Sequence, residues 1–199
     1  MARESLTYIP QSSKERLEIY KKCRTDPIFF VENYCTIIAK SKKILFKLYE
    51  FQKPILYELT IKRNNVIINK ARQMGLSTLM AAIITWLLLF QSNQEIVVIS
   101  EKDSKAKGLM RKVKLMIENV PKFLNLTPIV WNEHSVRLSN NSACTSEARS
   151  PNAARSETLN FLVIDECLKG NTKITLRNKN TGEIIETTLE EVYNNENYE

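Results

Sequence analysis

Two short apolar runs constrain the fold of this 199-residue chain more than any other feature. They are EIVVIS over 95–100 and FLVI over 161–164, and their apolar residues follow one another without a polar interruption. A strand of this composition is buried on both faces, which is typical of a parallel sheet covered by helices. Helical patterns over 77–90 and 103–118 precede and follow the first run. This alternation predicts an α/β domain with a largely parallel sheet flanked by helices.

Weaker patterns predict the remaining elements. The polar stretch 12–24, with interspersed apolar residues, predicts a surface helix that ends before Asp26-Pro27, since the helical conformation is disfavoured for a residue that precedes proline. The remaining predictions are a helix over 51–60, a strand over 66–68 and a hairpin over 135–148 that turns at Asn140-Asn141.

Composition excludes several classes of protein. With 43% hydrophobic and 26% charged residues, the chain lies in the globular range rather than among disordered or fibrous proteins. The longest apolar stretch, 79–90, is too short to span a bilayer, and no secretory signal follows Met1, so we expect no membrane partner. The single His134 argues against a histidine-based metal site or a Ser-His-Asp triad. No pair with metal-ligand spacing occurs among the cysteines, which are Cys23, Cys35, Cys144 and Cys167.

Charge is divided unevenly along the chain. Residues 167–199 hold four basic and six acidic residues, a net charge of −2. Because the whole chain carries +7, residues 1–166 carry +9. A basic body with an acidic tail indicates that two different units are joined here. The basic body suits a DNA-handling protein, and without a base-reading motif its contacts should be to the backbone of double-stranded DNA.

The polar loop that precedes the helix over 77–90 has the layout of a phosphate-binding loop. In such a loop the backbone N–H groups and the helix N-terminus face the anion, and a hydroxyl reaches the metal. The loop is KARQMGLST over 70–78. Compared with G-x-x-x-x-G-K-[ST], it lacks the first glycine and has Leu76 where lysine is usual. The alternative interpretation is an ordinary strand-to-helix turn.

Two further features favour a nucleotide site. The run over 161–164 leads directly into Asp165-Glu166, where one carboxylate suits Mg²⁺ and the next can orient or deprotonate water. Carboxylates without partners at the end of a buried strand are costly, so this pair is rarely structural. Upstream, the amide of Gln52 could pair with an adenine edge. We therefore predict ATP and Mg²⁺ as cofactors.

With these motifs, residues 26–166 resemble the ATPase domain of the large terminase subunit of tailed bacteriophages, the motor that packages DNA into the prohead. The stretches that carry the resemblance are DPIFFVENYC, YEFQKPIL, KARQMGLST and SPNAARSETLNFLVIDE. The resemblance implies a P-loop NTPase fold after an N-terminal helical segment, 1–25. It also implies the portal protein and the small terminase subunit as partners, and the host cytoplasm as location.

The resemblance also assigns roles to individual residues. Glu166 would activate water, Arg72 would act on the γ-phosphate, and Lys70 would supply the charge that Leu76 cannot. The segment 150–157, which contains Arg155 and directly follows Arg149, resembles the family's loop before the acidic strand. The alternative is a solvated basic loop. The implied nucleotide-binding residues are Gln52, Lys70, Gln73, Gly75, Ser77 and Thr78, with Asp165 and Ser77 as Mg²⁺ ligands.

After Glu166 the terminase pattern stops, and the tail resembles the start of an intein. The match is Cys167 with Gly170-Asn171-Thr172, followed by a predicted hairpin over 172–188 and a short helix over 189–193. Asn171 stands where inteins usually have Asp. A thiol at the first position can attack the preceding carbonyl and convert the Glu166–Cys167 peptide bond to a thioester. The alternative is a buried structural cysteine.

The resemblance implies that 167–199 is the N-terminal fragment of a split, β-rich intein. Neither a Thr-x-x-His block nor a terminal His-Asn follows Cys167. Trans-splicing with a separate C-terminal fragment would join Glu166 to the remainder of the motor, and the unspliced precursor should hydrolyse ATP poorly. Two alternatives remain: a helicase-like ATPase with an unremarkable hairpin extension, and a non-catalytic nucleic-acid-binding module.

Overall fold

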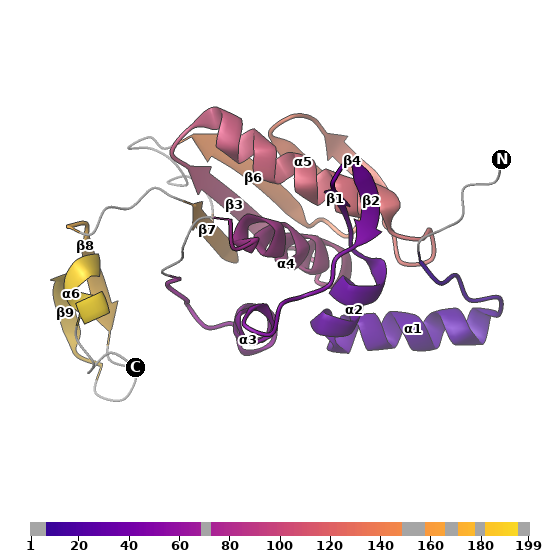
Figure 1. Ribbon diagram of the computed structural model, residues 1–199, viewed down its shortest axis with the longest axis horizontal. Coiled ribbons are helices and arrows are strands. Elements are labelled where there is room, and N and C mark those ends of the chain that lie inside the picture. Colours follow the sequence, from indigo (N-terminus) through magenta and orange to yellow (C-terminus); the bar gives the residue numbers. More distant parts are fainter. Residues whose placement is uncertain (1–6, 69–72, 149–157, 166–170, 178–181, 195–199) are drawn as a thin grey trace. The chain divides into compact units, whose positions relative to one another are not determined.

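The computed structural model describes residues 7–68, 73–148, 158–165, 171–177 and 182–194 (Figure 1). The chain divides into two compact units, Met1–Asp165 and Glu166–Glu199. None of the helices in the described ranges has the length and apolarity needed to cross a membrane.

A five-stranded sheet in the order β4-β5-β6-β3-β7 forms the centre of the first unit (Figure 1). β3 (Glu95–Ser100) lies between β6 (Ala143–Ala148) and β7 (Phe161–Asp165) and is parallel to both. β5 (Ser135–Leu138) and β4 (Pro128–Trp131) continue the sheet beyond β6 in antiparallel pairs. The parallel prediction is confirmed for three strands only. β5 runs opposite to them because the predicted hairpin turns the chain back at Asn140-Asn141, where Asn141 has φ +64°. A second reversal between β4 and β5 makes that pair antiparallel as well.

The two apolar runs of the sequence differ in burial. In β3 the side chains at 96–98 are all buried, as expected for a strand covered on both faces. In β7 only Val163 is buried, whereas Leu162 and Ile164 are each 45% exposed. β7 is also the terminal strand of the sheet, and among the described strands only β3 pairs with it. This edge of the sheet therefore presents apolar side chains to solvent.

Two helices pack against each other beside the sheet (Figure 1). α4 (Leu76–Phe90) is almost wholly buried, which explains its apolar composition on every side. α5 (Asp103–Asn119) is amphipathic and buries one stripe. Each large apolar side chain moved out of water contributes about 1.5–3 kcal/mol, so this pair dominates the core. The buried stripe of α5 consists of Ala106, Leu109, Met110, Val113, Met116 and Ile117.

The N-terminal segment covers the core with two helices. α1 (Ser13–Thr25) begins at Ser12, whose Oγ accepts a hydrogen bond from the Glu15 N–H at 3.1 Å. It ends before Asp26, as predicted, and Asp26 in turn caps α2 (Pro27–Tyr34). The indole Nε1 of Trp86 donates to the carbonyl of Cys23 at 2.8 Å and so ties α1 to α4.

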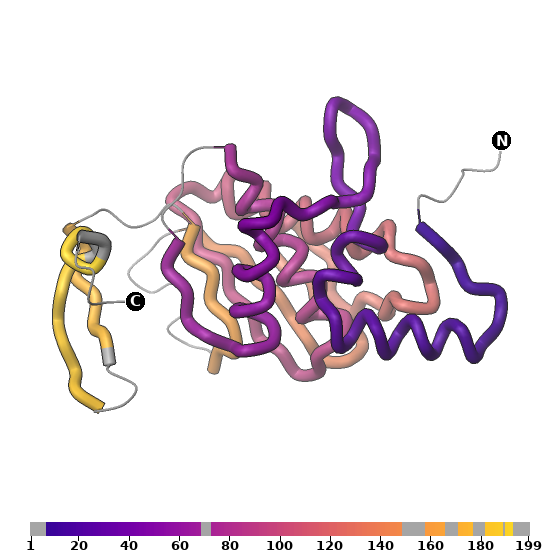
Figure 2. The backbone as a smooth tube through the Cα atoms, turned by 60° about the horizontal axis from the view of Figure 1, so that its bottom comes forward, coloured from indigo at the N-terminus to yellow at the C-terminus, as the bar shows by residue number. Residues whose placement is uncertain are grey.

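A hairpin that the sequence patterns did not predict follows α2. β1 (Thr36–Ala39) and β2 (Lys42–Leu45) pair antiparallel, and their tip projects from the unit (Figure 2). The turn residues Lys40 and Ser41 both have positive φ, a conformation usually marked by glycine or asparagine. The expected turn signal is therefore missing from the sequence.

The predicted helix over 51–60 forms α3 (Gln52–Tyr57), which continues as a π-helical turn over Glu58–Lys62. The predicted strand over 66–68 is wrong. Residues 63–68 have no regular structure, and Ile67 is largely exposed. β-branched residues favour a strand only where a neighbouring strand pairs with them, and none of the described strands does so here.

The second unit contains an antiparallel pair, β8 (Lys173–Arg177) and β9 (Ile184–Thr188), and the short helix α6 (Leu189–Asn194). A capping box begins α6: the Glu191 N–H donates to Thr188 Oγ1, and the Glu191 carboxylate accepts from the Thr188 N–H. That backbone hydrogen bond, together with those from the Thr187 and Thr188 hydroxyls, lowers the pKa of Glu191. The predicted hairpin and helix are thus both present.

Candidate nucleotide-binding site

Gly75 marks the start of α4. Its backbone is left-handed, with φ +70°, and its carbonyl accepts hydrogen bonds from the N–H groups of Thr78 and Leu79, both at 3.0 Å. The first N–H groups of a helix have no partner inside the helix, so they can face an anion. Leu76, at the position where lysine is usual, is only 6% exposed and belongs to the hydrophobic core. The loop therefore directs an apolar side chain inward at that position.

Gln52 forms a hydrogen bond through its side chain to the loop that precedes α4. Its side chain is fully buried, its Oε1 accepts from the Tyr49 N–H at 3.1 Å, and its Nε2 donates to the Met74 carbonyl at 3.2 Å. Both halves of the amide thus make hydrogen bonds within the protein and connect the start of α3 to the loop that precedes α4. Recognition of adenine by Gln52 stays a prediction.

The close approach of Gln52 to Gly75 gives a prediction for stability. A Cβ at position 75 would lie 3.1 Å from Gln52 Nε2, and an L-residue in the left-handed region costs about 1–2 kcal/mol. We expect Gly75→Ala to lower the free energy of unfolding in urea by at least about 1 kcal/mol. The control is Gly108→Ala in α5, where the nearest atom, Arg111 Nη2, is 3.9 Å away. Alanine there should stabilise by about 0.5–1 kcal/mol. Equal stability of Gly75→Ala and the parent chain would contradict the argument.

Ser77 and Asp165, which are 88 positions apart in the sequence, meet at one point. Ser77 lies in the first turn of α4, and Asp165 is the last residue of β7. The Ser77 Oγ donates to Asp165 Oδ2 at 3.4 Å. The fold therefore brings together the hydroxyl and the carboxylate that the sequence proposed as Mg²⁺ ligands.

The donor set at this point fits Mg²⁺, which prefers hard oxygen ligands and usually takes only one or two carboxylates from the protein. Ser100 ends β3 and is aligned with Asp165 in the parallel pair. Its buried Oγ has no hydrogen-bond partner among the described residues, so a further oxygen is available at the same end of the parallel strands. The described residues contain no group of three or more His, Cys, Asp or Glu that could hold a metal by itself. A bound ion would depend on phosphate and water for the rest of its shell.

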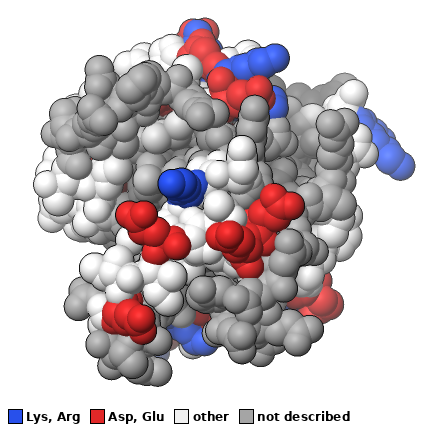
Figure 3. All heavy atoms as spheres, turned by 90° about the vertical axis from the view of Figure 1, so that its left-hand side faces the viewer, with Lys and Arg blue, Asp and Glu red and all other residues white. Residues whose placement is uncertain are grey.

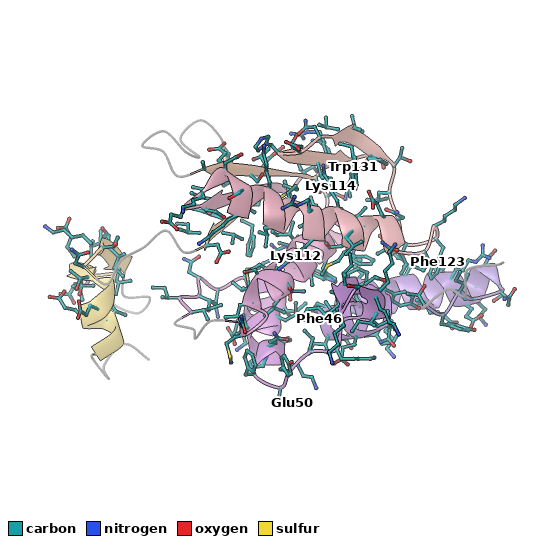
Figure 4. The ribbon with its side chains drawn as sticks, turned by 45° about the horizontal axis from the view of Figure 1, so that its top comes forward. Phe46, Glu50, Lys112, Lys114, Phe123 and Trp131 are labelled. Atoms are coloured by element: carbon teal, nitrogen blue, oxygen red, sulfur yellow. The ribbon has the colours of Figure 1, made fainter. Side chains whose placement is uncertain are left out.

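The sequence patterns did not identify Lys112, which lies at this site. It projects from α5 toward α4 (Figure 4), and its Nζ donates to Thr78 Oγ1 at 3.2 Å. Burial lowers the pKa of Lys112, an effect that the Asp165 carboxylate opposes. A signal was available: position 112 follows Leu109 by three residues and so interrupts the apolar stripe of the predicted helix.

A cavity of about 350 Å³ opens beside Thr78, between β1 and α5. Its walls are mainly apolar, and Arg111 and Lys112 supply two cationic side chains. The remaining lining residues are Thr36, Ile37, Ile38, Gly108, Leu115 and Met116.

Several predicted site residues lie outside the described ranges. Gln73 lies inside the described ranges, where its side chain is exposed and its backbone is left-handed, with φ +64°. The residues outside the ranges are Lys70, Arg72, Arg149, Arg155, Glu166 and Cys167, together with Gly170, Asn180 and Thr181 of the predicted tail motifs.

Comparison with known proteins supports the architecture. No protein-family model matches the sequence. Among solved structures, the crystal structure of the large terminase of bacteriophage HK97 is similar, with a TM-score of 0.55 and 16% sequence identity. The similarity covers 74% of this chain and 38% of the HK97 chain, so the present chain spans well under half of that protein. Over about three quarters of its length, the chain therefore has a fold like that of a phage large terminase.

Proposed function

We propose that residues 1–166 are the front part of a viral DNA-packaging motor, a terminase large subunit that binds ATP and Mg²⁺. The observation that carries this proposal is the meeting of Ser77 and Asp165 at the N-terminus of α4, with 3.4 Å between Oγ and Oδ2. A hydroxyl in the first turn of a helix beside a carboxylate at the end of a parallel strand is the arrangement of P-loop NTPases. The terminase-like fold supports the same conclusion.

In this proposal each residue of the site has a defined task. The N–H groups of the first turn of α4 bind phosphate, while Ser77 and Asp165 hold Mg²⁺. When bound, Mg²⁺ neutralises negative charge on the β- and γ-phosphates. Glu166 follows Asp165 directly and orients or deprotonates the attacking water. Arg72 acts on the γ-phosphate, and Lys70 adds charge at the start of the loop.

DNA is the proposed substrate of the motor. The +9 charge of residues 1–166 favours contacts with phosphate groups, which release counterions when they are neutralised. The portal protein and the small terminase subunit are the proposed protein partners, because the similar HK97 structure is that of a large terminase.

We further propose that residues 167–199 are the N-terminal fragment of a split intein, completed by a second polypeptide. The described tail supports a need for a partner: Ile184 is 67% exposed, and Ile174, Leu176 and Ile185 are only partly buried. An isolated two-stranded hairpin is marginally stable at best. Its exposed acidic residues, Glu183, Glu186, Glu190 and Glu191, suit a basic partner. Acidic side chains gather on the face shown in Figure 3.

The splicing step begins at the Glu166–Cys167 junction. The Cys167 sulfur attacks the carbonyl carbon of Glu166, an S–C bond forms, and the C–N bond breaks. The amide nitrogen takes up a proton and becomes the free α-amino group of Cys167. Later steps, with groups supplied by the partner, would join Glu166 to the rest of the motor.

The exposed edge of the sheet at β7 supports the proposal that the motor is incomplete before splicing. Leu162 and Ile164 on β7 expose apolar surface at an edge where soluble proteins normally place charge or cover. We propose that the polypeptide joined after Glu166 covers this edge. Before splicing, the ATPase would therefore be incomplete and should turn over ATP poorly.

The test is equilibrium binding of a fluorescent, non-hydrolysable ATP analogue to residues 1–199, with Mg²⁺ and with EDTA. We expect saturable, Mg²⁺-dependent binding with a Kd between about 1 μM and 1 mM, and negligible ATP turnover. No binding at millimolar analogue would contradict the ATPase proposal and favour a non-catalytic nucleic-acid-binding module. ATP turnover that Glu166→Gln abolishes would contradict the precursor proposal and favour a stand-alone helicase-like ATPase.

A further inference from the structure

The phosphate loop of this chain lacks the lysine that usually follows its glycine. Leu76 occupies that position and is buried in the core, so it offers no charge to a phosphate. A triphosphate carries several negative charges, and backbone N–H groups alone leave most of that charge uncompensated. Lys70 and Arg72 are proposed to add charge from the loop itself, and a cation from another element that reached the first turn of α4 would compensate more of the negative charge.

Lys112 is such a cation among the described residues. It comes from α5, and its Nζ lies 3.2 Å from Oγ1 of Thr78, the third residue of α4. Figure 4 shows Lys112 on the side of α5 that faces α4, whereas Lys114 lies on the other side, near Trp131. Lys114 donates to the Asn132 carbonyl, and its Nζ is 5.2 Å from the centre of the Trp131 ring.

The charge of Lys112 has no contacting carboxylate within the described part of the chain. Other lysines of α5 are paired: Lys105 with Glu101, and Lys107 with both Asp103 and Glu133. For Lys112 the contact within the described residues is the neutral Thr78 hydroxyl, and Asp165 acts on it only at longer range. A partly buried cation beside the positive end of a helix is unfavourable. The Asp165 carboxylate, which meets Ser77 in this turn, offsets part of that cost, and a bound phosphate would offset more.

We propose that Lys112 binds the phosphate chain of the nucleotide from α5, in addition to the charge that is proposed for Lys70 in the loop. This inference rests on the proposed nucleotide function and adds a binding residue to it. An ammonium group has three donors, so Lys112 can keep its hydrogen bond to Thr78 and donate to phosphate oxygens as well. Lys112 acts from α5, whereas Lys70, the residue proposed from the sequence, belongs to the loop itself.

The experiment compares Lys112→Met and Lys112→Gln with Lys114→Met in residues 1–199. The measurements are the Kd of the Mg²⁺-bound ATP analogue, the Kd of adenosine, and the melting temperature without ligand. We expect both Lys112 variants to raise the Kd of the ATP analogue about 10- to 100-fold, the effect of losing a hydrogen bond to a charged group. Adenosine binding should stay unchanged, because adenosine has no phosphate. Lys114→Met should match the parent chain in both affinities.

The remaining outcomes separate the two proposals. If the parent chain binds the analogue and both Lys112 variants bind it equally well, the role of Lys112 is overturned while the nucleotide function stands. If the parent chain binds no analogue, both proposals fail. A merely structural lysine would lower the melting temperature and weaken ATP and adenosine alike. The uncharged Lys112→Gln retains a donor for Thr78, so its normal melting temperature with weakened ATP binding would isolate the charge as the cause.

Discussion

Replacement of Asp165 by asparagine is expected to abolish the Mg²⁺-dependent part of nucleotide binding. Asparagine keeps the shape of the side chain, and it can still meet the Ser77 hydroxyl, which lies 3.4 Å from Oδ2. It removes the negative charge, however, and a neutral amide is a much weaker ligand for Mg²⁺ than a carboxylate. An electrostatic contribution of several kcal/mol corresponds to a loss in affinity of more than about 100-fold.

Glu95→Gln provides the matched control for this experiment. Glu95 begins β3, at the opposite end of the strand from Ser100, which is aligned with Asp165. It forms an ion pair with Arg137 at 2.9 Å, and such a surface pair contributes about 1 kcal/mol at most. The control should bind the Mg²⁺-bound analogue like the parent chain. Asp165→Asn with unchanged affinity in Mg²⁺ would show that this carboxylate does not hold the ion.

Replacement of Cys167 by alanine is expected to eliminate ligation completely. Without the thiol no acyl shift occurs at the Glu166–Cys167 bond, so no thioester forms and the later steps have no substrate. The measurement is mass spectrometry of residues 1–199 mixed with a candidate partner, an intein fragment that ends in His-Asn and is followed by terminase sequence. The parent chain should give a ligated product that lacks 167–199.

Cys144→Ala serves as the control, because Cys144 is a different kind of cysteine. It is buried in β6, and burial raises the pKa of its thiol to about 12, so it stays protonated and unreactive. Its replacement should leave ligation intact. A ligated product from Cys167→Ala would overturn the assignment of the nucleophile, and the tail would then be an unremarkable extension.

The ATPase proposal and the splicing proposal meet at one peptide bond, the one between Glu166 and Cys167. β7 ends at Asp165, the predicted water-activating residue is Glu166, and the predicted splicing nucleophile is Cys167. Leu162 and Ile164 leave the neighbouring sheet edge apolar and exposed. A splice at this bond would attach new polypeptide directly beside both the carboxylates and the open edge. Splicing would therefore control when the motor becomes active.

Much of the fold could be predicted because its signals are local. The continuous apolar run of β3 predicted that strand at its observed bounds, and Asp26-Pro27 predicted the end of α1. Errors arose where the local signal was missing or depended on a neighbour. The turn at Lys40 and Ser41 adopts positive φ without glycine, and 66–68 pairs with none of the described strands although its composition favours a strand.

The sequence by itself determined which residue types are present and how they repeat over a few positions. That was enough for the α/β class, the phosphate-loop pattern and the break between Glu166 and Cys167. Tertiary structure alone decided that Ser77 meets Asp165 across 88 positions and that Lys112 meets Thr78 across 34. It also buried the side chain of Leu76 in the core and brought the amide of Gln52 into hydrogen-bonding contact with the Met74 carbonyl of the loop. The reason is physical: periodicity depends on near neighbours in the chain, whereas these contacts depend on how buried helices and strands pack.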